Sequence, residues 1–138
     1  MKLRTHRSSI PGFTLVEIML VVATIALLAS IAMPSIFRAR KRSQATRILE
    51  DLRMIDSAMQ LYAMEFNCSG KESFSSSDAA KLKKYIKTES ALFSSLPNDL
   101  LGNSFTFLTL DVHPRINNAT FENFSDVAPM DFWSPYNP

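Results

Sequence analysis

Hydrophobic residues are distributed unevenly along the chain, and the longest apolar run lies near its beginning. Residues 13–37 are apolar over 25 positions, and Glu17 is the one ionisable residue among them. As a helix rising about 1.5 Å per residue, this run would be roughly 37 Å long, slightly more than the ~30 Å hydrocarbon core of a bilayer. The pattern therefore predicts a membrane-spanning helix.

The apolar pattern continues beyond this run in another form. Six apolar residues recur at spacings of three or four, which places them on one face of a helix: Ile48, Leu52, Ile55, Met59, Tyr62 and Phe66. No Gly or Pro lies between Arg38 and Phe66, so the sequence predicts one long helix over residues 13–66. Its second part, residues 38–66, would present one apolar face for a small domain to cover. Asn67 tolerates the left-handed conformation that ends many helices, so we expect the chain to turn there.

The remaining residues, 67–138, have the pattern of a small mixed domain. A short amphipathic helix is predicted from residue 78 to about residue 88. After a turn, residues 104–112 are rich in aromatic and β-branched side chains, and residues 119–124 predict a second strand. The sequence therefore predicts an α+β fold, in which a small antiparallel sheet covers the apolar face of the long helix.

The charge distribution excludes some classes of partner. The formal net charge is +2, but the basic residues gather at positions 2–7 and 38–42. Residues 67–138 contain six Lys or Arg against eight Asp or Glu, so no basic surface for a nucleic-acid backbone is predicted. Four lysines between positions 81 and 87 are typical of the solvated face of a small helix rather than of a binding patch.

Candidate chemistry is sparse. Cys68 is the only cysteine, so a disulfide within one chain is excluded, and we expect a packing residue rather than a reactive thiol. His6 and His113 stand alone, and no nucleophile-elbow, zinc-protease or phosphate-cradling motif occurs. The sequence therefore predicts neither an enzyme nor a cofactor.

The apolar run is compatible with more than one kind of segment. The basic residues before it and Ser30-Ile31-Ala32 within it fit a secretory signal peptide cleaved near Ala32, and an uncut anchor is a further alternative. Glu17 argues against both, because a carboxylate deep in the bilayer costs about 2.5–3.5 kcal/mol on insertion scales. Cleavage after Gly12 would create an amino group on Phe13, one helical turn from Glu17. That cation would offset the carboxylate, within one chain or between neighbours.

Residues 12–17, Gly-Phe-Thr-Leu-Val-Glu, resemble the processing motif of type IV prepilins and type II secretion pseudopilins. The resemblance extends over the basic leader and the apolar helix, about a third of the chain. It implies that a prepilin peptidase cuts after Gly12 and methylates the amine of Phe13, so that residues 1–12 are a leader. It also implies that Glu17 meets the terminal amine of an adjacent subunit. Pro34 stands where the family often has a proline that loosens the helix, although a proline here also fits a plain kink.

The same resemblance implies a structural subunit of a type IV pilus-like filament or a type II secretion pseudopilus. Its expected partners are copies of itself, related minor pilins or pseudopilins, the prepilin peptidase, an inner-membrane assembly platform and, before assembly, membrane lipid. We expect a single-pass protein of the bacterial inner membrane with its head outside the cytoplasm, and a periplasmic or extracellular filament after assembly. The alternative is an exported or membrane-anchored binding protein with an ordinary signal peptide.

Two features refine that expectation. Basic residues flank the apolar run on both sides, so the positive-inside rule leaves the orientation open, and the cluster at positions 38–42 is expected to be solvated, to meet lipid headgroups or to pair with neighbouring subunits. One cysteine cannot form the C-terminal disulfide loop of typical pilins, which favours a pseudopilus.

The head carries a weaker resemblance to major pseudopilins. Phe105 and Phe107 stand in the tyrosine places of one of their sequence stretches, whose Pro-Trp pair is missing here, and five other residues match it: Leu96, Pro97, Asp99, Gly102 and Asn103. A similar fragment at residues 131–136 is the alternative equivalent of that stretch. Some major pseudopilins bind calcium after this stretch, so four aspartates are weak calcium candidates: Asp99, Asp111, Asp126 and Asp131. Their spacing is not that of an EF-hand, and aspartates also form turns.

Overall fold

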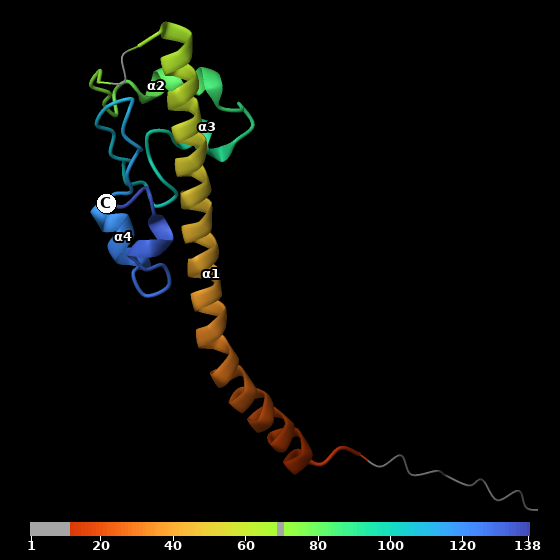
Figure 1. Ribbon diagram of the computed structural model, residues 1–138. Coiled ribbons are helices and arrows are strands. Elements are labelled where there is room, and N and C mark those ends of the chain that lie inside the picture. The colour runs from red at the N-terminus through yellow and green to blue at the C-terminus, as the bar shows by residue number, and fades with distance from the viewer. Residues whose placement is uncertain (1–11, 69–70) are drawn as a thin grey trace, which may run out of the picture. The chain divides into compact units, whose positions relative to one another are not determined.

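The computed structural model describes residues 12–68 and 71–138 (Figure 1). The expected leader therefore lies outside the described residues, apart from Gly12, and so do Ser69 and Gly70. The chain divides into two compact units, the first ending at Phe37 and the second spanning Arg38–Pro138.

A single helix, α1, spans Leu15–Phe66 and contains 52 residues. It begins two residues later than the predicted helix and ends at the predicted residue. Asn67 follows with φ of 48°, the left-handed conformation that the sequence predicts for the end of the helix. Cys68 N–H donates to the Ala63 carbonyl at 3.1 Å and Asn67 N–H to the Met64 carbonyl at 3.4 Å, which together form a Schellman motif.

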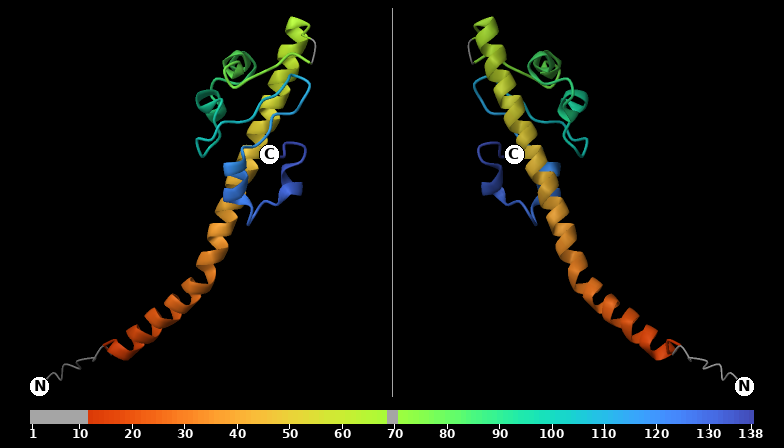
Figure 2. Two further views of the ribbon diagram at one scale, coloured as in Figure 1. Left: turned by 90° about the vertical axis from the view of Figure 1, so that its left-hand side faces the viewer. Right: turned by 90° about the vertical axis from the view of Figure 1, so that its right-hand side faces the viewer.

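The core of the second unit is built on the predicted apolar face of α1. Seven residues of the helix are buried: Ala45, Ile48, Leu49, Leu52, Ile55, Ala58 and Met59. Tyr62 is half-buried, and Phe66 is 57% exposed although its ring stacks on Tyr62 with centroids 4.7 Å apart. The helices and connecting segments of the head lie beside this part of α1 (Figure 1, Figure 2). Large head side chains complete the core, among them Phe105, Ile116 and Trp133.

Residues 12–68 and 71–138 contain no β-strand, so the predicted sheet of the head is not confirmed. Within these residues, isolated antiparallel bridges occur at Ser73–Thr109, Asn98–Ser104 and Thr106–Arg115. Thr106 and Arg115 exchange both backbone hydrogen bonds, at 3.0 and 2.9 Å, and shortly after Arg115 the chain enters a helix.

The predicted second strand at residues 119–124 is part of helix α4, Asn118–Phe124. Asn117 caps this helix, because its side-chain oxygen accepts the Ala119 N–H at 2.9 Å. Thr120 and Phe124 are four residues apart and both buried, so the segment packs one helical face rather than alternate residues.

The predicted helix at residues 78–88 is present but shorter. Helix α2 spans Ala79–Leu82 and continues as the 3₁₀ turn η1, Lys83–Tyr85, before Ile86 becomes extended. Helix α3, Ala91–Ser95, and the 3₁₀ turn η2, Met130–Trp133, are elements that the sequence reasoning did not anticipate. The Leu96–Pro97 and Ser134–Pro135 peptide bonds are cis.

Candidate functional site

The segment before α1 contains the two residues predicted to flank a cleavage. Gly12 and Phe13 are not helical, and Phe13 is 82% exposed. A Cβ added to Gly12 would meet no atom within 4 Å. Because the chain itself leaves room for a larger side chain, any requirement for glycine here would come from a molecule that binds this segment.

Glu17 lies in the first turn of α1 and forms reciprocal hydrogen bonds with Thr14. The Thr14 backbone N–H and hydroxyl both donate to Glu17 Oε2, each at 2.8 Å. In return the Glu17 backbone N–H donates to Thr14 Oγ1 at 3.3 Å. This arrangement is a capping box, which gives partners to N–H groups that have none inside the helix.

The capping box supplies the Glu17 carboxylate with hydrogen bonds but with no positive charge. A carboxylate in a low-dielectric environment needs hydrogen bonds and a nearby positive charge. Hydrogen bonds alone do not offset most of the free energy lost when the carboxylate leaves water. Thr14 therefore meets one requirement and leaves the other to a cation. Sequence reasoning missed Thr14, although the Thr-x-x-Glu spacing before an apolar run is a recognisable signal for this cap.

The first part of α1 presents apolar side chains to its surroundings on every side. All residues from 15 to 37 are exposed, and α1 is the one helix among those described that is long and apolar enough to cross a membrane. Its hydroxyl groups bond within the helix: Thr24, Ser30 and Ser35 each donate to the carbonyl three residues back, at 2.7–2.8 Å. With these groups satisfied, the surface suits lipid or other apolar helices.

Pro34 lies inside α1, and the helix continues on both sides of it. Proline has no N–H, so the Ser30 carbonyl loses its usual partner four residues on. This is compatible both with a plain kink and with a loosening point, and the assembly role of Pro34 remains a prediction.

Two residues of the basic cluster after the apolar run hold the C-terminal part of the head. Lys41 Nζ contacts Asp126 Oδ1 at 3.0 Å and the Asn123 carbonyl at 3.1 Å. Arg42 donates to the Val127 carbonyl at 2.9 Å, and its guanidinium lies 5.4 Å from the ring centroid of Phe132. Arg38 and Arg40 are exposed. Half of this cluster is therefore structural rather than simply solvated.

The lysines of α2 and η1 bind within the head. Lys81 forms an ion pair with Asp78 at 2.8 Å, and this contact with its hydrogen bond lowers the pKa of Asp78 to about 2. Lys83 lies over the ring of Phe93, 5.4 Å from its centroid. For Lys81 and Lys83 these contacts agree with a surface face rather than a binding patch, while Lys87 lies beyond η1.

Glu65 joins the last turn of α1 to η1. It accepts hydrogen bonds from Lys84 Nζ and from the Tyr85 hydroxyl, both at 2.5 Å. The bond to Lys84 lowers the pKa of Glu65, and the bond to Glu65 raises the pKa of Tyr85 to about 12. The cluster ties the head to α1 at the end opposite Lys41.

The four calcium candidates lie in different settings. Asp99 is buried and holds a turn, since its Oδ1 accepts the N–H groups of Leu101 and Asn103, each at 2.9 Å. Its Oδ2 accepts the hydroxyl of Thr120 at 2.5 Å, and Gly102 in the same turn has φ of 87°. The Asp99 carboxylate thus has partners for both oxygens and acts as a structural acceptor.

The other three aspartates do not join Asp99. Asp126 pairs with Lys41, while Asp111 and Asp131 are exposed. Within residues 12–68 and 71–138 no group of three or more His, Cys, Asp or Glu is placed to hold a metal ion. A calcium site built from these residues would need oxygen ligands beyond the four aspartates.

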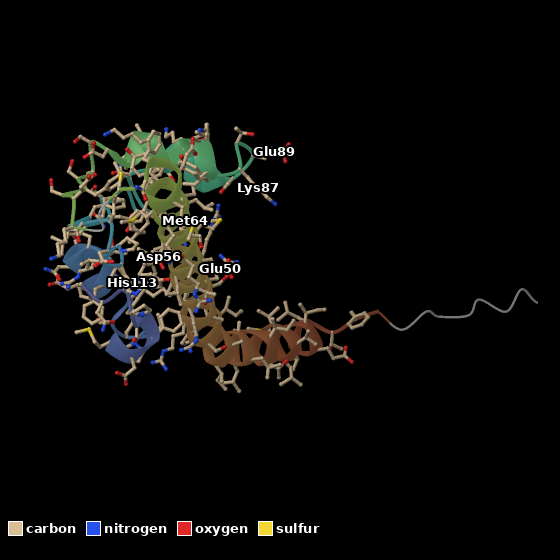
Figure 3. The ribbon with its side chains drawn as sticks, turned by 45° about the horizontal axis from the view of Figure 1, so that its top comes forward. Glu50, Asp56, Met64, Lys87, Glu89 and His113 are labelled. Atoms are coloured by element: carbon tan, nitrogen blue, oxygen red, sulfur yellow. The ribbon has the colours of Figure 1, made fainter. Side chains whose placement is uncertain are left out.

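The titratable pair outside these clusters is His113 and Asp56. His113 Nδ1 lies 3.0 Å from Asp56 Oδ1 (Figure 3). The His113 ring packs edge-on against Tyr136, with ring centroids 5.7 Å apart. Burial raises the pKa of Tyr136. The contact joins the middle of α1 to the last residues of the chain and presents no nucleophile.

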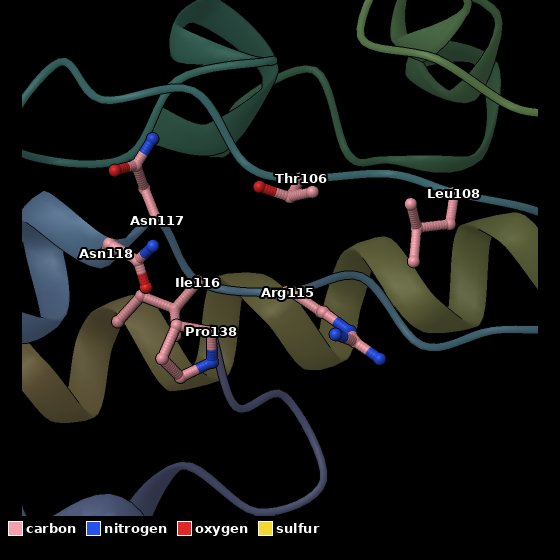
Figure 4. A pocket seen from close by; sticks show the side chains of 7 residues that line it. All are labelled: Thr106, Leu108, Arg115, Ile116, Asn117, Asn118 and Pro138. Atoms are coloured by element: carbon pink, nitrogen blue, oxygen red, sulfur yellow. The ribbon is translucent and has the colours of Figure 1, made fainter.

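A shallow cavity near the C-terminal residue contains one ionisable side chain, that of Arg115. It is lined by Thr106, Leu108, Arg115, Ile116, Asn117, Asn118 and Pro138, and the guanidinium of Arg115 extends away from the two asparagines (Figure 4). Asn117 is already used, because its Nδ2 donates to the Ser104 carbonyl and its Oδ1 caps α4. Cys68 is free and half-buried, and burial raises the pKa of its thiol, which favours the unreactive protonated form.

Comparison with known proteins gives relatives from type II secretion systems and from a type IV pilus. The chain is 23% identical over 111 residues to the type II secretion system core protein G of Klebsiella pneumoniae, an alignment that covers 77% of this chain and 79% of the relative. It is 22% identical over 103 residues to the core protein G of Aeromonas hydrophila, covering 71% of this chain and 72% of that protein.

A third relative comes from a pilus. The chain is 32% identical over 80 residues to the type IV wide pilus major component PilA4 of Thermus thermophilus, which covers 58% of this chain and 57% of the relative. No family model matches the chain, and no solved structure does so significantly.

Proposed function

We propose that this chain is a structural subunit of the type IV pilin-like family, which polymerises through the apolar part of α1 into a filament. Its similarity to type II secretion core protein G and to a type IV pilus component supports the proposal. The observation that carries the proposal is the apolar surface of residues 15–37, which is exposed on every side within the chain. Such a surface must be covered by lipid or by other protein, because its transfer out of water is strongly favourable. A membrane before assembly and neighbouring helices after it would each provide that cover.

Processing before assembly is the second part of the proposal. Cleavage after Gly12 would leave the amine of Phe13 immediately before Thr14, the residue that hydrogen-bonds Glu17. The terminal amine, methylated or not, would then supply the cation that the capping box lacks. If the amine of a neighbouring subunit fills this role, Glu17 is fully neutralised only when two subunits are in register.

Cleavage followed by assembly implies particular partners and a particular location for the chain. We propose that a prepilin peptidase and an inner-membrane assembly platform act on the chain, and that related minor pilins or pseudopilins join copies of it in the polymer. Before assembly the apolar half of α1 would span the inner membrane, with the head outside the cytoplasm.

Of the two kinds of filament, we propose the type II secretion pseudopilus as the first candidate. The alignments to the core proteins G cover 77% and 71% of this chain, against 58% for the pilus component. The higher identity to PilA4 keeps a type IV pilus as the second candidate.

The experiment that tests the proposal is mass spectrometry of the mature N-terminus, on chain purified from membranes of cells that contain the peptidase. The expected first residue is Phe13 carrying a methylated amine. Electron microscopy of sheared material from the same cells, with the assembly system present, is expected to show filaments of this chain.

Two results would contradict the proposal. A mature chain beginning at Met33 would indicate an ordinary signal peptide cleaved after Ala32, and it would remove the first turns of α1, which contain Glu17. A chain that retains residue 1 under these conditions would indicate an uncut anchor.

A further inference from the structure

Helix α1 carries a second exposed apolar stripe on its later half, separate from the stripe that enters the core. Leu52, Ile55 and Met59 are buried, whereas three residues on another side of the same turns are 41%, 50% and 77% exposed: Met54, Leu61 and Met64. Their spacings of seven and three residues keep them on one face. A soluble surface does not need such a stripe, which makes it a candidate for contact with another molecule.

The segment that follows η1 turns this stripe into a groove. Six residues that line it are here called the α1 groove: Arg53, Met54, Ser57, Leu61, Ile86 and Lys87. Ser57 is small and its hydroxyl is already bonded to the Arg53 carbonyl at 3.0 Å, so the floor between Met54 and Leu61 is low and largely apolar. Figure 3 shows Met64 on α1 and Lys87 on the adjacent segment.

The edges of the α1 groove are basic. Arg53 and Lys87 line it and no acidic residue does. Within residues 12–68 and 71–138, the ion pairs of the head involve neither of them. An apolar floor with two cations at its edge is complementary to an apolar ridge that carries carboxylates.

The same chain presents exposed apolar and acidic residues close together elsewhere on the head. Four of them are here called the 108–112 ridge: Glu72, Leu108, Asp111 and Val112, of which Leu108 also lines the cavity near Pro138. Leu108 is 47% and Val112 is 37% exposed. The Ser73–Thr109 bridge and the hydrogen bond from Leu110 N–H to the Glu72 carbonyl hold these residues beside one another.

We infer that the α1 groove receives the 108–112 ridge of a second copy of this chain, with Arg53 and Lys87 facing Glu72 and Asp111. The inference rests on the proposed filament, because a helical polymer is built from heterologous contacts, in which two different patches of one chain meet. The groove and the ridge are two such patches with matching polarity and opposite charge. The contact would join heads, in addition to any packing between the apolar halves of α1.

The direct test is a disulfide between the two patches in assembled filaments. Cys68→Ser removes the native thiol, and Leu61→Cys with Val112→Cys places one thiol in each patch. On mild oxidation we expect dimers, trimers and higher species in a non-reducing gel, because every subunit would be linked to the next. The matched control combines Leu61→Cys with Leu100→Cys, since Leu100 is 45% exposed but lies outside the ridge.

A charge exchange tests the same contact without cysteine. Lys87→Glu and Asp111→Lys alone are each expected to lower filament yield about fivefold, the upper range for one exposed ion pair. The double variant is expected to recover to within about twofold of the unmodified chain. Processing at Gly12 should be unchanged in all three, since neither residue lies near it in the sequence.

The outcomes separate this inference from the proposed function. If the unmodified chain forms filaments, but the Leu61–Val112 pair gives no more cross-linking than the control, the groove does not bind the ridge. If the filament yield of the double variant does not recover, the same conclusion follows. If the unmodified chain forms no filament in the complete assembly system, the proposed function fails first.

Discussion

Glu17 shows how one side chain can serve two purposes that a sequence alone does not separate. Its carboxylate accepts two hydrogen bonds from Thr14 and caps α1, as an ordinary helix-starting residue does. The same carboxylate lies in a segment where an isolated negative charge is costly. A loss of function in Glu17→Ala would therefore mix the loss of a cap with the loss of a charge.

Glu17→Gln separates the two effects. Glutamine keeps the capping box, because its side-chain oxygen accepts the same two hydrogen bonds, but it carries no charge. We expect both Glu17→Gln and Glu17→Ala to be cleaved after Gly12 and to lose most filament assembly, measured as the yield of sheared filaments against total mature chain. Glu17→Ala should additionally weaken the start of α1, because it removes the side-chain half of the capping box. Assembly of Glu17→Gln at the unmodified level would show that capping, and not charge, is the role of this residue.

At the level of elements, the long helix was predictable and the head was not. The 25-residue apolar run, the stripe at three- and four-residue spacings and Asn67 each rest on local rules, and together they predicted α1 to within two residues. Residues 119–124 were predicted as a second strand, but so short a segment does not decide between a side-chain period of two and a helical period near four. The side chain of Asn117 decides it, by capping the helix that follows.

Asn117 is therefore a test of why α4 is a helix. Asn117→Ala removes the acceptor for the Ala119 N–H and the donor to the Ser104 carbonyl, and it should lower the free energy of unfolding by about 1–2 kcal/mol. Asn117→Asp keeps the cap and loses only the donor, so it should cost less. Trp133 is the only tryptophan and is fully buried, so its fluorescence reports unfolding in urea for the full chain in detergent. Equal stability of Asn117→Ala and the unmodified chain would show that tertiary packing fixes α4 without its cap.

At the scale of the whole molecule, the sequence singles out candidate residues more readily than the contacts that support them. The apolar run, Gly12, Phe13 and Glu17 are candidates because each departs from what a soluble domain requires. Contacts between residues far apart in the chain, such as Lys41 with Asp126, carry no local signal, since any of several acids could have been the partner. The α1 groove was missed for a related reason, because its second wall is formed by residues after Tyr85 that are distant in sequence.

Two kinds of contact hold the head on α1 within the second unit, and their magnitudes differ. Lys41 and Asp126 are each about half exposed, and an ion pair of that kind contributes at most about 1 kcal/mol. Leu52 is fully buried in the core, where truncation of a leucine to alanine costs about 2–5 kcal/mol. The head should therefore be held by its apolar contacts, with the charged contacts fixing the position of the C-terminal segment.

Urea unfolding of three variants, followed by Trp133 fluorescence in detergent, checks this order. Leu52→Ala should lower the free energy of unfolding by several kcal/mol, and Lys41→Met by less than about 1 kcal/mol. Raising the salt concentration should reduce the difference between Lys41→Met and the unmodified chain, because an exposed pair is screened, and should leave the Leu52→Ala difference unchanged. Asp126→Asn removes the charge of the other partner in the same ion pair. It should change the free energy of unfolding, and its salt dependence, as Lys41→Met does. If Lys41→Met instead proves as costly as Leu52→Ala, the cation next to the apolar run is the main attachment of the head, and assembly that engages this cation would loosen the fold.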